Sequence, residues 1–237
     1  MNQNTQLTCV SGFWKIKNKH DNKFEQWFNN TLKINCPYVF FGNKEAISMV
    51  KKYRQELPTH YIELNIEDFE TYKYKDNMKT DPVHCPSIEL NLVWNEKIFM
   101  VHKACILNPF SSDFFCWIDA GLCTYRRKPP PPRAFPCAQK LENLPKNKFI
   151  YCSSNAKFEE EKFKKGMYHL YHHISGTYLL HKSIINNVVS LYTSYLSSID
   201  KEDIWSDQVI LTLLFKDNQD LFYKCCDGYG SLIRSLF

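Results

Sequence analysis

Two kinds of hydrophobic pattern alternate along the chain. Short, continuous apolar runs, such as 37–42 and 114–118, have the length and composition of strands that are buried on both faces. Longer stretches, such as 22–34 and 183–199, carry apolar residues at helical spacing and polar residues between them. Because buried strands alternate with amphipathic helices, the pattern predicts an α/β fold whose mixed, mostly parallel central sheet is flanked by helices.

Capping and turn residues predict where the remaining helices and strands begin and end. Asn43 can cap a helix over 44–56, because its side chain accepts a hydrogen bond from a free backbone N–H at the helix start. Pro86 suits the first turn of a helix that runs to about Leu107. The segment 66–80, rich in Asp, Glu, Lys and Tyr, predicts a solvated helix or loop. Further strands are expected at 6–10, 60–64 and 148–152 and from residue 222, and a helix opens at 205–208.

One acidic residue follows the central apolar run directly. In open α/β sheets ligands bind beyond the carboxyl ends of the strands, so Asp119 stands where a binding site is expected. Gly121, two residues later, removes a side chain and lets a backbone or a bulky anion approach. A plain strand end followed by an Asp-x-Gly turn explains the same residues, and both interpretations stay open.

Length and charge narrow the classes of function. A chain of 237 residues with 44% hydrophobic and 23% charged residues predicts one globular domain. The net charge of +5 is spread along the sequence, which favours small anionic ligands such as a diphosphate over nucleic acid. The sequence lacks both G-x-G-x-x-G and the P-loop motif, which argues against a dinucleotide dehydrogenase and against a P-loop ATPase or kinase.

The cysteines and the apolar runs predict the cellular compartment of the protein. Ten cysteines occur without a C-x-x-C pair, which favours a reduced, cytoplasmic protein over a disulfide-bonded one. The first residues lack the build of a signal peptide, and no apolar run approaches the roughly 20 residues that a membrane-spanning helix needs. We therefore expect a cytoplasmic protein without a transmembrane segment.

Residues 108–121 (Asn-Pro-Phe-Ser-Ser-Asp, then Phe-Phe-Cys-Trp-Ile-Asp-Ala-Gly) resemble the central signature of the HtrL/YibB (WlaTC-like) glycosyltransferases. Shorter matches at 8–9, at 94–97 (Trp-Asn-Glu-Lys) and at 205–208 (Trp-Ser-Asp-Gln) extend the resemblance over nearly the whole chain. It implies a single domain with the nucleotide-sugar fold called GT-A, in which 1–121 binds the nucleotide and 122–237 binds the sugar and the acceptor. It also implies metal-dependent transfer of a sugar from a nucleoside-diphosphate sugar, most simply a UDP-sugar, to a hydroxyl of a glycan or protein.

The resemblance also implies a set of site residues. In this fold a short acidic motif, usually Asp-x-Asp, holds Mn²⁺ or Mg²⁺ on the donor diphosphate. Here Asp119 takes the first acidic position, Gly121 replaces the second acid, and Asp227 is the candidate for a further metal ligand near the chain end. The donor contacts it implies are Thr8, Ser11 and Phe13 in the first strand and loop, Arg54 and Lys97 as cations, Trp117, Ile118 and Gly121 around the acidic motif, and Ser175 and Gly176 in the sugar pocket.

Asp207 and Gln208 match the Asp-Gln pair that many GT-A enzymes place beside the transferred sugar. Asp207 would deprotonate the acceptor if the reaction inverts the anomeric carbon, or orient the sugar if it retains the configuration. Helix capping by Ser206 and Asp207 explains the same residues, and a solvated surface lysine explains Lys97.

Other interpretations stay open. His169, His172 and His173 could place two imidazoles on one helical face for a metal, but no acid or cysteine has matching spacing, which favours ordinary polar residues in a strand or loop. The basic, proline-rich run 125–133 predicts an extended surface loop, an anion-facing flap or a docking peptide. An inactive nucleotide-sugar-binding protein and a protein-interaction module are the alternative functions.

Overall fold

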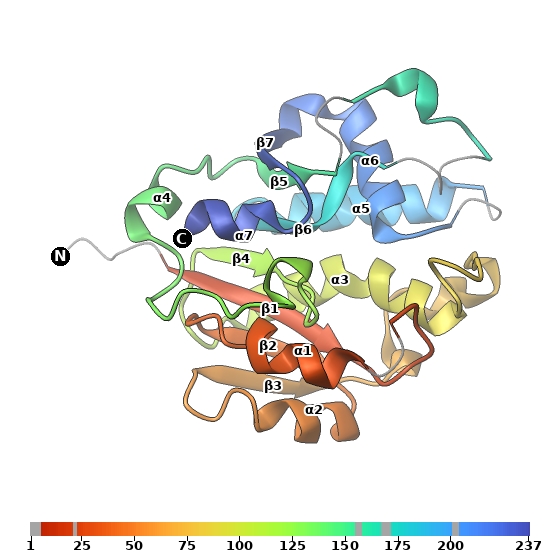
Figure 1. The fold of residues 1–237 in the computed structure, drawn as a ribbon. Coiled ribbons are helices and arrows are strands. Elements are labelled where there is room, and N and C mark those ends of the chain that lie inside the picture. The colour runs from red at the N-terminus through yellow and green to blue at the C-terminus, as the bar shows by residue number, and fades with distance from the viewer. Residues whose placement is uncertain (1–5, 21–22, 155–157, 167–171, 201–203) are drawn as a thin grey trace.

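A seven-stranded mixed sheet forms the centre of one α/β domain (Figure 1). The computed structural model describes residues 6–20, 23–154, 158–166, 172–200 and 204–237. The predicted fold class, an α/β domain with a mixed, mostly parallel sheet flanked by helices, is confirmed. The strands are β1 (Leu7–Phe13), β2 (Tyr38–Gly42), β3 (Thr59–Glu63), β4 (Phe114–Trp117), β5 (Phe149–Ser153), β6 (Ile174–His181) and β7 (Phe222–Asp227).

The strand order, β3-β2-β1-β4-β6-β5-β7, reverses direction beside β1. The chain runs outward from β1 to β2 and β3 and then returns to place β4 on the other side of β1, with all four strands parallel. Such a reversal point leaves a crevice beyond the carboxyl ends of the two central strands. The acidic motif follows β4 and therefore lies at this crevice.

Helices cover both faces of the sheet (Figure 1). Apolar residues of three helices pack against one face, and those of four shorter helices pack against the other. The first layer consists of α3 (Ile88–Leu107), α5 (Ile185–Ser198) and α6 (Asp207–Asp217), and the second of α1 (Lys23–Thr31), α2 (Lys44–Lys51), α4 (Ala138–Glu142) and α7 (Ser231–Leu236). Because each face is covered, the inner strands β1, β2, β4, β5 and β6 are buried on both sides, as continuous apolar sequences predict. The edge strands β3 and β7 are partly exposed.

Capping explains where two of the helices begin. The Oδ1 atom of Asn43 accepts a hydrogen bond from the Ala46 N–H at 2.9 Å, which confirms Asn43 as the cap of α2. The long helix α3 begins at Ile88, two residues after Pro86, which the prediction placed in the first turn. Ser87, not Pro86, is adjacent to its first turn, and the Ser87 hydroxyl accepts from the backbone N–H of Leu90 at 3.2 Å. A hydroxyl that satisfies a free N–H determines this start better than proline, which supplies no acceptor.

Strand β6 follows the histidines, for which the sequence left a strand or a loop of polar residues open. The structure has an eight-residue strand, antiparallel to both β4 and β5, in the interior of the sheet. Its polar side chains are buried because they find partners, as Ser175 does with the Cys152 thiol at 2.8 Å. Buried polar residues interrupt an apolar pattern, so the sequence underestimates this strand.

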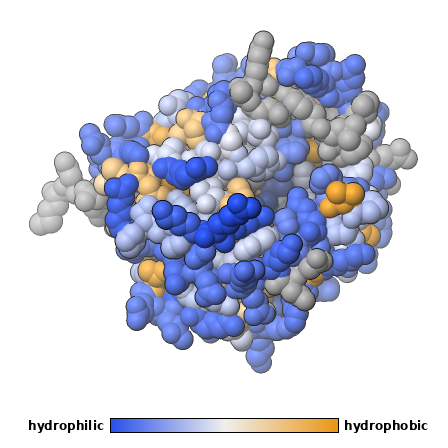
Figure 2. Space-filling view, viewed as in Figure 1, coloured by the Kyte–Doolittle hydropathy of each residue, from blue (hydrophilic) through white to orange (hydrophobic). Residues whose placement is uncertain are grey.

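The short connections and the surface complete the description. Residues 66–80 contain the 3₁₀ helices Ile66–Asp68 and Tyr72–Asn77, as expected for a solvated segment. In the part of the chain that the structure describes, no helix combines the length and the apolar character needed to cross a bilayer. The face drawn in Figure 2 is largely hydrophilic, and its hydrophobic side chains form small, separate groups.

Candidate active site

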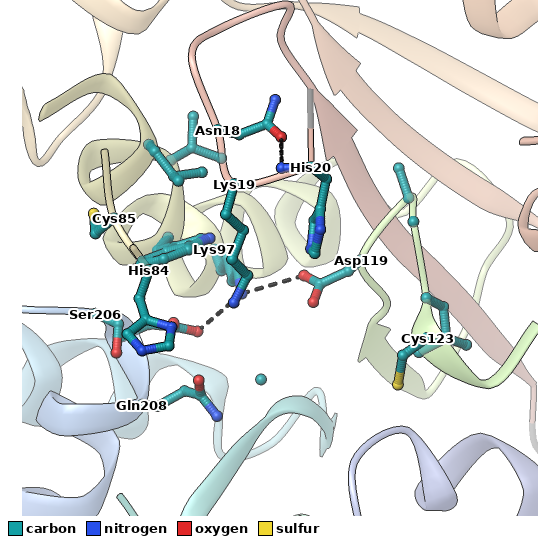
Figure 3. Close-up of a pocket in the computed structure, with 18 of the residues that line it drawn as sticks. Asn18, Lys19, His20, His84, Cys85, Lys97, Asp119, Cys123, Ser206 and Gln208 are labelled. Carbon is teal, nitrogen blue, oxygen red and sulfur yellow. Dashed lines mark hydrogen bonds and ion pairs between the residues drawn. The ribbon is translucent and has the colours of Figure 1, made fainter. Parts of the chain in front are cut away.

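A cavity of about 910 Å³ opens at the carboxyl ends of the central strands (Figure 3). Its walls come from the end of β1 and the following loop, from α3, from the segment after β4, and from the start of β6. The beginning of α6 and the turn between β7 and α7 close the remaining side. This volume and position are typical of a small-molecule site at the reversal point of an α/β sheet.

A lysine bridges two carboxylates at the floor of this cavity. The Nζ atom of Lys97 lies 3.2 Å from Oδ1 of Asp119 and 3.2 Å from Oδ2 of Asp207 (Figure 3). The Lys97 and Asp207 side chains are only 6% and 4% exposed, whereas that of Asp119 is 49% exposed. The buried charges are therefore paired with each other, and Asp119 presents its carboxylate to the open cavity.

The pairing determines the protonation of the buried groups. Burial favours the neutral form of Lys97, but the charges of Asp119 and Asp207 outweigh it and raise the pKa of the ammonium above its ordinary value. Burial raises the pKa of Asp207 to about 6, with the attraction of Lys97 acting in the opposite direction. At neutral pH the buried pair therefore consists of an ammonium and a carboxylate.

A hydrogen bond from Trp117 fixes the orientation of the Asp119 carboxylate. This tryptophan ends β4 and is 1% exposed, and its Nε1–H donates to Oδ1 of Asp119 at 2.9 Å. Oδ1 thus receives both the indole N–H and the Lys97 ammonium. Among the described residues Oδ2 has no hydrogen-bond partner, so it is the atom available to a ligand.

The residues fit a divalent cation that arrives together with a diphosphate. Mg²⁺ in nucleotide sites is usually held by one or two carboxylates, phosphate oxygens and water, so the free oxygen of Asp119 suffices as the protein ligand. Within the described residues, no group of three or more His, Cys, Asp or Glu side chains is close enough to hold a metal without a substrate. A cation at Asp119 would therefore depend on the donor for its other ligands.

Helix α3 also positions the segment that carries Asp207. The Asn91 amide donates to the backbone oxygen of Ile204 at 2.9 Å, and the Asn95 amide donates to that of Trp205 at 2.8 Å. Ser206 is adjacent to the first turn of α6, but its hydroxyl makes no capping hydrogen bond. The start of α6 is thus anchored by the same helix that provides Lys97.

Gln208 is fixed by two hydrogen bonds. Its Nε2 donates to the backbone oxygen of Ile174 at 3.1 Å and to the Tyr229 hydroxyl at 2.8 Å. The Tyr229 hydroxyl also pairs with Nε2 of His172. Because both amide hydrogens are used, Oε1 of Gln208 is the polar atom that this side chain can offer to a ligand.

An aromatic and basic wall lies on the Asp119 side of the cavity. Phe13 packs against Phe24 with ring centroids 5.3 Å apart, and a Cβ atom on Gly121 would lie 2.8 Å from the Phe24 ring. The Arg126 guanidinium stacks on Trp27 at 3.8 Å and donates to the backbone oxygen of Gly121 at 2.8 Å. The glycine after Asp119 therefore makes room for this aromatic side chain and receives a cation beside the acidic motif.

Eight of the residues predicted for the site line this one cavity. They come from five separate segments, and the fold alone brings them together. They are Phe13, Lys97, Trp117, Asp119, Gly121, Gly176, Asp207 and Gln208. A Cβ atom on Gly176 would lie 3.3 Å from the Lys97 Nζ and 3.8 Å from Oδ2 of Asp119, so this glycine keeps space open above the charged cluster.

Other predicted site residues do not line the cavity. Ser11 and Ile118 are buried in the sheet layer, and Thr8 pairs with the Ser112 hydroxyl at 2.8 Å. Ser175, as described above, pairs with a thiol. The carboxylate of Asp227 lies 3.2 Å from Lys224 on the same exposed strand.

Arg54 also lies away from the cavity. Its guanidinium is buried over the ring of Tyr38 at 3.7 Å and donates to the backbone oxygens of Leu32, Ile34 and Cys36. These bonds, with one more to Thr59, engage every nitrogen of the side chain, so none remains for a nucleotide. Arg54 fixes the chain that connects α1 to β2.

The histidines do not form a helical metal site in the described region. His172 lines the cavity, whereas the ring of His173 is buried and pairs with Tyr151 and Ser153. Burial lowers the pKa of His173 to about 4, so its ring is neutral at physiological pH. His169 lies outside the described residues.

Several lining residues were missed by the sequence analysis. His20 and His84 come from loops, and no spacing pattern distinguishes them from ordinary surface histidines. Thr177 lies in β6, a segment for which the sequence left strand and loop open. Tyr229 could have been recognised from its two flanking glycines, which are typical of a turn that directs one side chain into a site. In the structure these glycines have φ of +97° and +69°.

Comparisons with known proteins give a family and a fold. The family described as "Bacterial protein of unknown function (HtrL_YibB)" matches residues 59–234. None of the curated proteins matches the chain by sequence. Among solved structures, the apo form of mouse xyloside xylosyltransferase 1 is similar at a TM-score of 0.55 and 12% identity, over 93% of this chain and 84% of that one. This likeness establishes a shared fold.

Two further structures are similar at lower scores. A galactosyltransferase, LgtC, in complex with donor and acceptor sugar analogues gives a TM-score of 0.48 at 10% identity, over 88% of this chain and 70% of that one. A 4-diphosphocytidyl-2C-methyl-D-erythritol synthase from Anaerococcus prevotii DSM 20548 gives 0.41 at 10% identity, over 97% and 91%.

Proposed function

The chain belongs to the HtrL_YibB family, and we propose that it is a glycosyltransferase that moves a sugar from a nucleoside-diphosphate sugar, a UDP-sugar, to a hydroxyl group of a glycan or protein. The observation that carries this proposal is the Lys97 ammonium between Asp119 and Asp207, at the carboxyl ends of parallel strands. The cluster offers one exposed carboxylate, one fixed cation and one buried carboxylate in a single cavity. Transfer from a diphosphate can use each of them: a carboxylate to hold a cation, a positive charge beside the leaving group, and a carboxylate beside the sugar.

The Asp119 side would receive the diphosphate. Oδ2 of Asp119 would be a ligand to Mn²⁺ or Mg²⁺, which on binding with the donor would offset charge on the leaving diphosphate. Lys97 supplies a permanent positive charge at the same place, and Arg126 adds another beside the motif. Phe13 and Phe24 form an apolar wall that suits the base of the nucleotide.

The Asp207 side would receive the sugar and the acceptor. Asp207 lies beyond Lys97 as seen from Asp119, and the carbonyl oxygen of Gln208 can accept from a sugar hydroxyl. If the anomeric carbon is inverted, Asp207 accepts the proton of the attacking hydroxyl; its pKa of about 6 keeps it mainly ionised at neutral pH. If the configuration is retained, Asp207 orients the sugar. NMR of the anomeric proton in the first-formed product separates the two roles.

A melting screen tests the proposal. The purified protein is heated with UDP, GDP or CDP, each with and without Mn²⁺, and hydrolysis of the corresponding nucleotide sugars is followed by release of the diphosphate. We expect one nucleotide to raise the melting temperature in a Mn²⁺-dependent way and its sugar to be hydrolysed slowly. No shift with any nucleotide would overturn the proposal, and a shift without hydrolysis or transfer would leave a binding protein.

A further inference from the structure

The five tryptophans have different environments. Trp14 and Trp117 each donate the indole N–H to a partner inside the protein, and Trp27 is covered by a guanidinium group. Trp94 and Trp205 are half-buried and line the cavity. These two have no role in the chemistry described so far.

Trp94 presents an unused aromatic surface. Among the described residues its ring makes no aromatic stack and no cation contact, and its N–H donates to no acceptor. Buried tryptophans normally satisfy this donor within the protein, so a lining tryptophan that does not is available to a ligand. Trp94 lies three residues before Lys97 on α3 and therefore on the same face of the helix.

Trp205 lies at the same end of the cavity. It directly precedes Ser206, and its backbone oxygen accepts from the Asn95 amide at 2.8 Å, which ties it to the turn of α3 that carries Trp94. The Ser206 hydroxyl makes no hydrogen bond within the described chain, although its position could cap α6. Two indoles and a free hydroxyl thus gather beside Asp207.

This end is separate from the acidic motif. Figure 3 shows His84, Ser206 and Gln208 on one side of the Lys97 ammonium and His20 and Asp119 on the other. Ser206 and Gln208 offer neutral hydrogen-bonding groups at this end, where the Asp207 carboxylate is already paired with Lys97, whereas Arg126 stands beside Asp119. A ligand at the Ser206 end would therefore be polar, uncharged and able to cover an aromatic ring.

We propose that Trp94 is the platform for a sugar ring of the acceptor, so that the acceptor is a glycan. A pyranose has an apolar C–H face that packs on an indole, and ring hydroxyls that accept from its N–H and bond to Ser206. A serine or threonine hydroxyl of a protein acceptor has no such face. The inference rests on the proposed function, because it assigns the acceptor to the Asp207 side of the same cavity.

Saturation-transfer NMR with simple glycosides tests this assignment. The methyl β-glycosides of glucose, galactose and N-acetylglucosamine are measured with wild type, Trp94→Ala and Trp94→Phe. Trp27→Phe is the matched control, since that ring does not line the cavity. Wild type should saturate the ring protons of at least one glycoside. Trp94→Ala should weaken its binding about tenfold or more, whereas Trp94→Phe, which keeps a ring, and the control should change it much less.

Nucleotide binding in the same samples separates this inference from the function on which it rests. Trp94→Ala should keep the full UDP-induced melting shift, because the platform is outside the donor end. No glycoside signal in wild type, or equal binding by Trp94→Ala, would overturn the inference while a UDP shift upheld the transferase proposal. Glycoside binding that depends on Trp94 without any nucleotide shift would uphold the sugar site and overturn the transferase.

Discussion

The ammonium of Lys97 lies 3.2 Å from the carboxylate of Asp207, and both side chains are almost completely buried. Neither charge is well hydrated, so each depends on the other for its stabilisation. The pair joins α3 to the first turn of α6 across 110 residues of sequence. It therefore contributes to the fold as well as to the proposed chemistry, and substitutions must separate the two.

Replacing Lys97 with Met should destabilise the protein. The variant leaves Asp207 buried without a cation, and loss of one partner of a buried pair costs about 3–5 kcal/mol. Urea unfolding at pH 7.5 measures the loss, which should be smaller at pH 5, where the Asp207 carboxyl binds a proton in the folded state. Adding Asp207→Asn to Lys97→Met should restore part of the stability. Equal stabilities of the single and double variants would contradict the pairing.

Replacing Asp207 with Asn should change how stability depends on pH. The pKa of Asp207 is about 6 in the folded protein against an ordinary value of 3.8, so between these values only the folded state holds the proton. The free energy of unfolding due to this carboxyl therefore falls as pH rises from about 4 to about 6. The Asn variant lacks this titration, so relative to wild type its stability should rise between pH 4 and pH 6, by at most about 3 kcal/mol. This rise adds to a cost that does not change over the same range, because Lys97 keeps only Asp119 as its partner. A gap that stays constant over this range would disprove the shift.

Asp119 should matter for ligand binding more than for stability. Its side chain is half-exposed, so Asp119→Ala should alter the melting temperature of the free protein little. The same variant should lose the Mn²⁺-dependent shift with UDP. Asp227→Ala is the control, because Asp227 pairs with Lys224 outside the cavity and should keep the shift. Loss of the shift in both variants would instead support Asp227 as a second metal ligand.

Arg54 should matter for stability and not for the donor. Arg54→Ala removes the donors to three backbone oxygens and leaves those oxygens buried, which should cost about 3 kcal/mol or more. Arg54→Lys should recover only part of this loss, because an ammonium cannot reproduce the planar fork of a guanidinium. Melting temperatures and the KM for the nucleotide sugar are measured together. A raised KM without a lower melting temperature would instead show that Arg54 contributes to donor binding.

The sequence alone predicts the part of the site that is formed by consecutive residues. An apolar run followed by Asp119 shows both a buried strand and the acid at its end, because strand, turn and carboxylate are consecutive. Lys97 and Asp207 were identified by resemblance, and their contact with each other is set by the packing of α3 against α6. No spacing rule links residues so far apart, so the ion pair required the fold.

The same limit explains the errors. Arg54 resembled a nucleotide ligand because a cation after a helix is common, but its partners are backbone oxygens, which every residue has and no pattern marks. Strand β6 was obscured because its buried polar residues, such as Ser175, break the apolar run. Trp94 was recorded only as part of a motif, since its exposure within a cavity depends on its neighbours.

The indole N–H of Trp117 should orient the Asp119 carboxylate and should not contact the substrate. Trp117→Phe keeps an aromatic ring in the core but removes the donor to Oδ1, so Asp119 would lose one of the two groups that direct Oδ2 into the cavity. Partners that orient a metal ligand typically change metal affinity 10–100-fold, and we expect about tenfold weaker Mn²⁺ binding in the presence of UDP. Titration of Mn²⁺ by electron paramagnetic resonance measures this. Trp14→Phe is the control, because it removes another buried indole of the cavity wall whose N–H donates to the Leu64 backbone oxygen and not to Asp119. If both variants bind Mn²⁺ as wild type does, Lys97 alone is sufficient to hold the carboxylate.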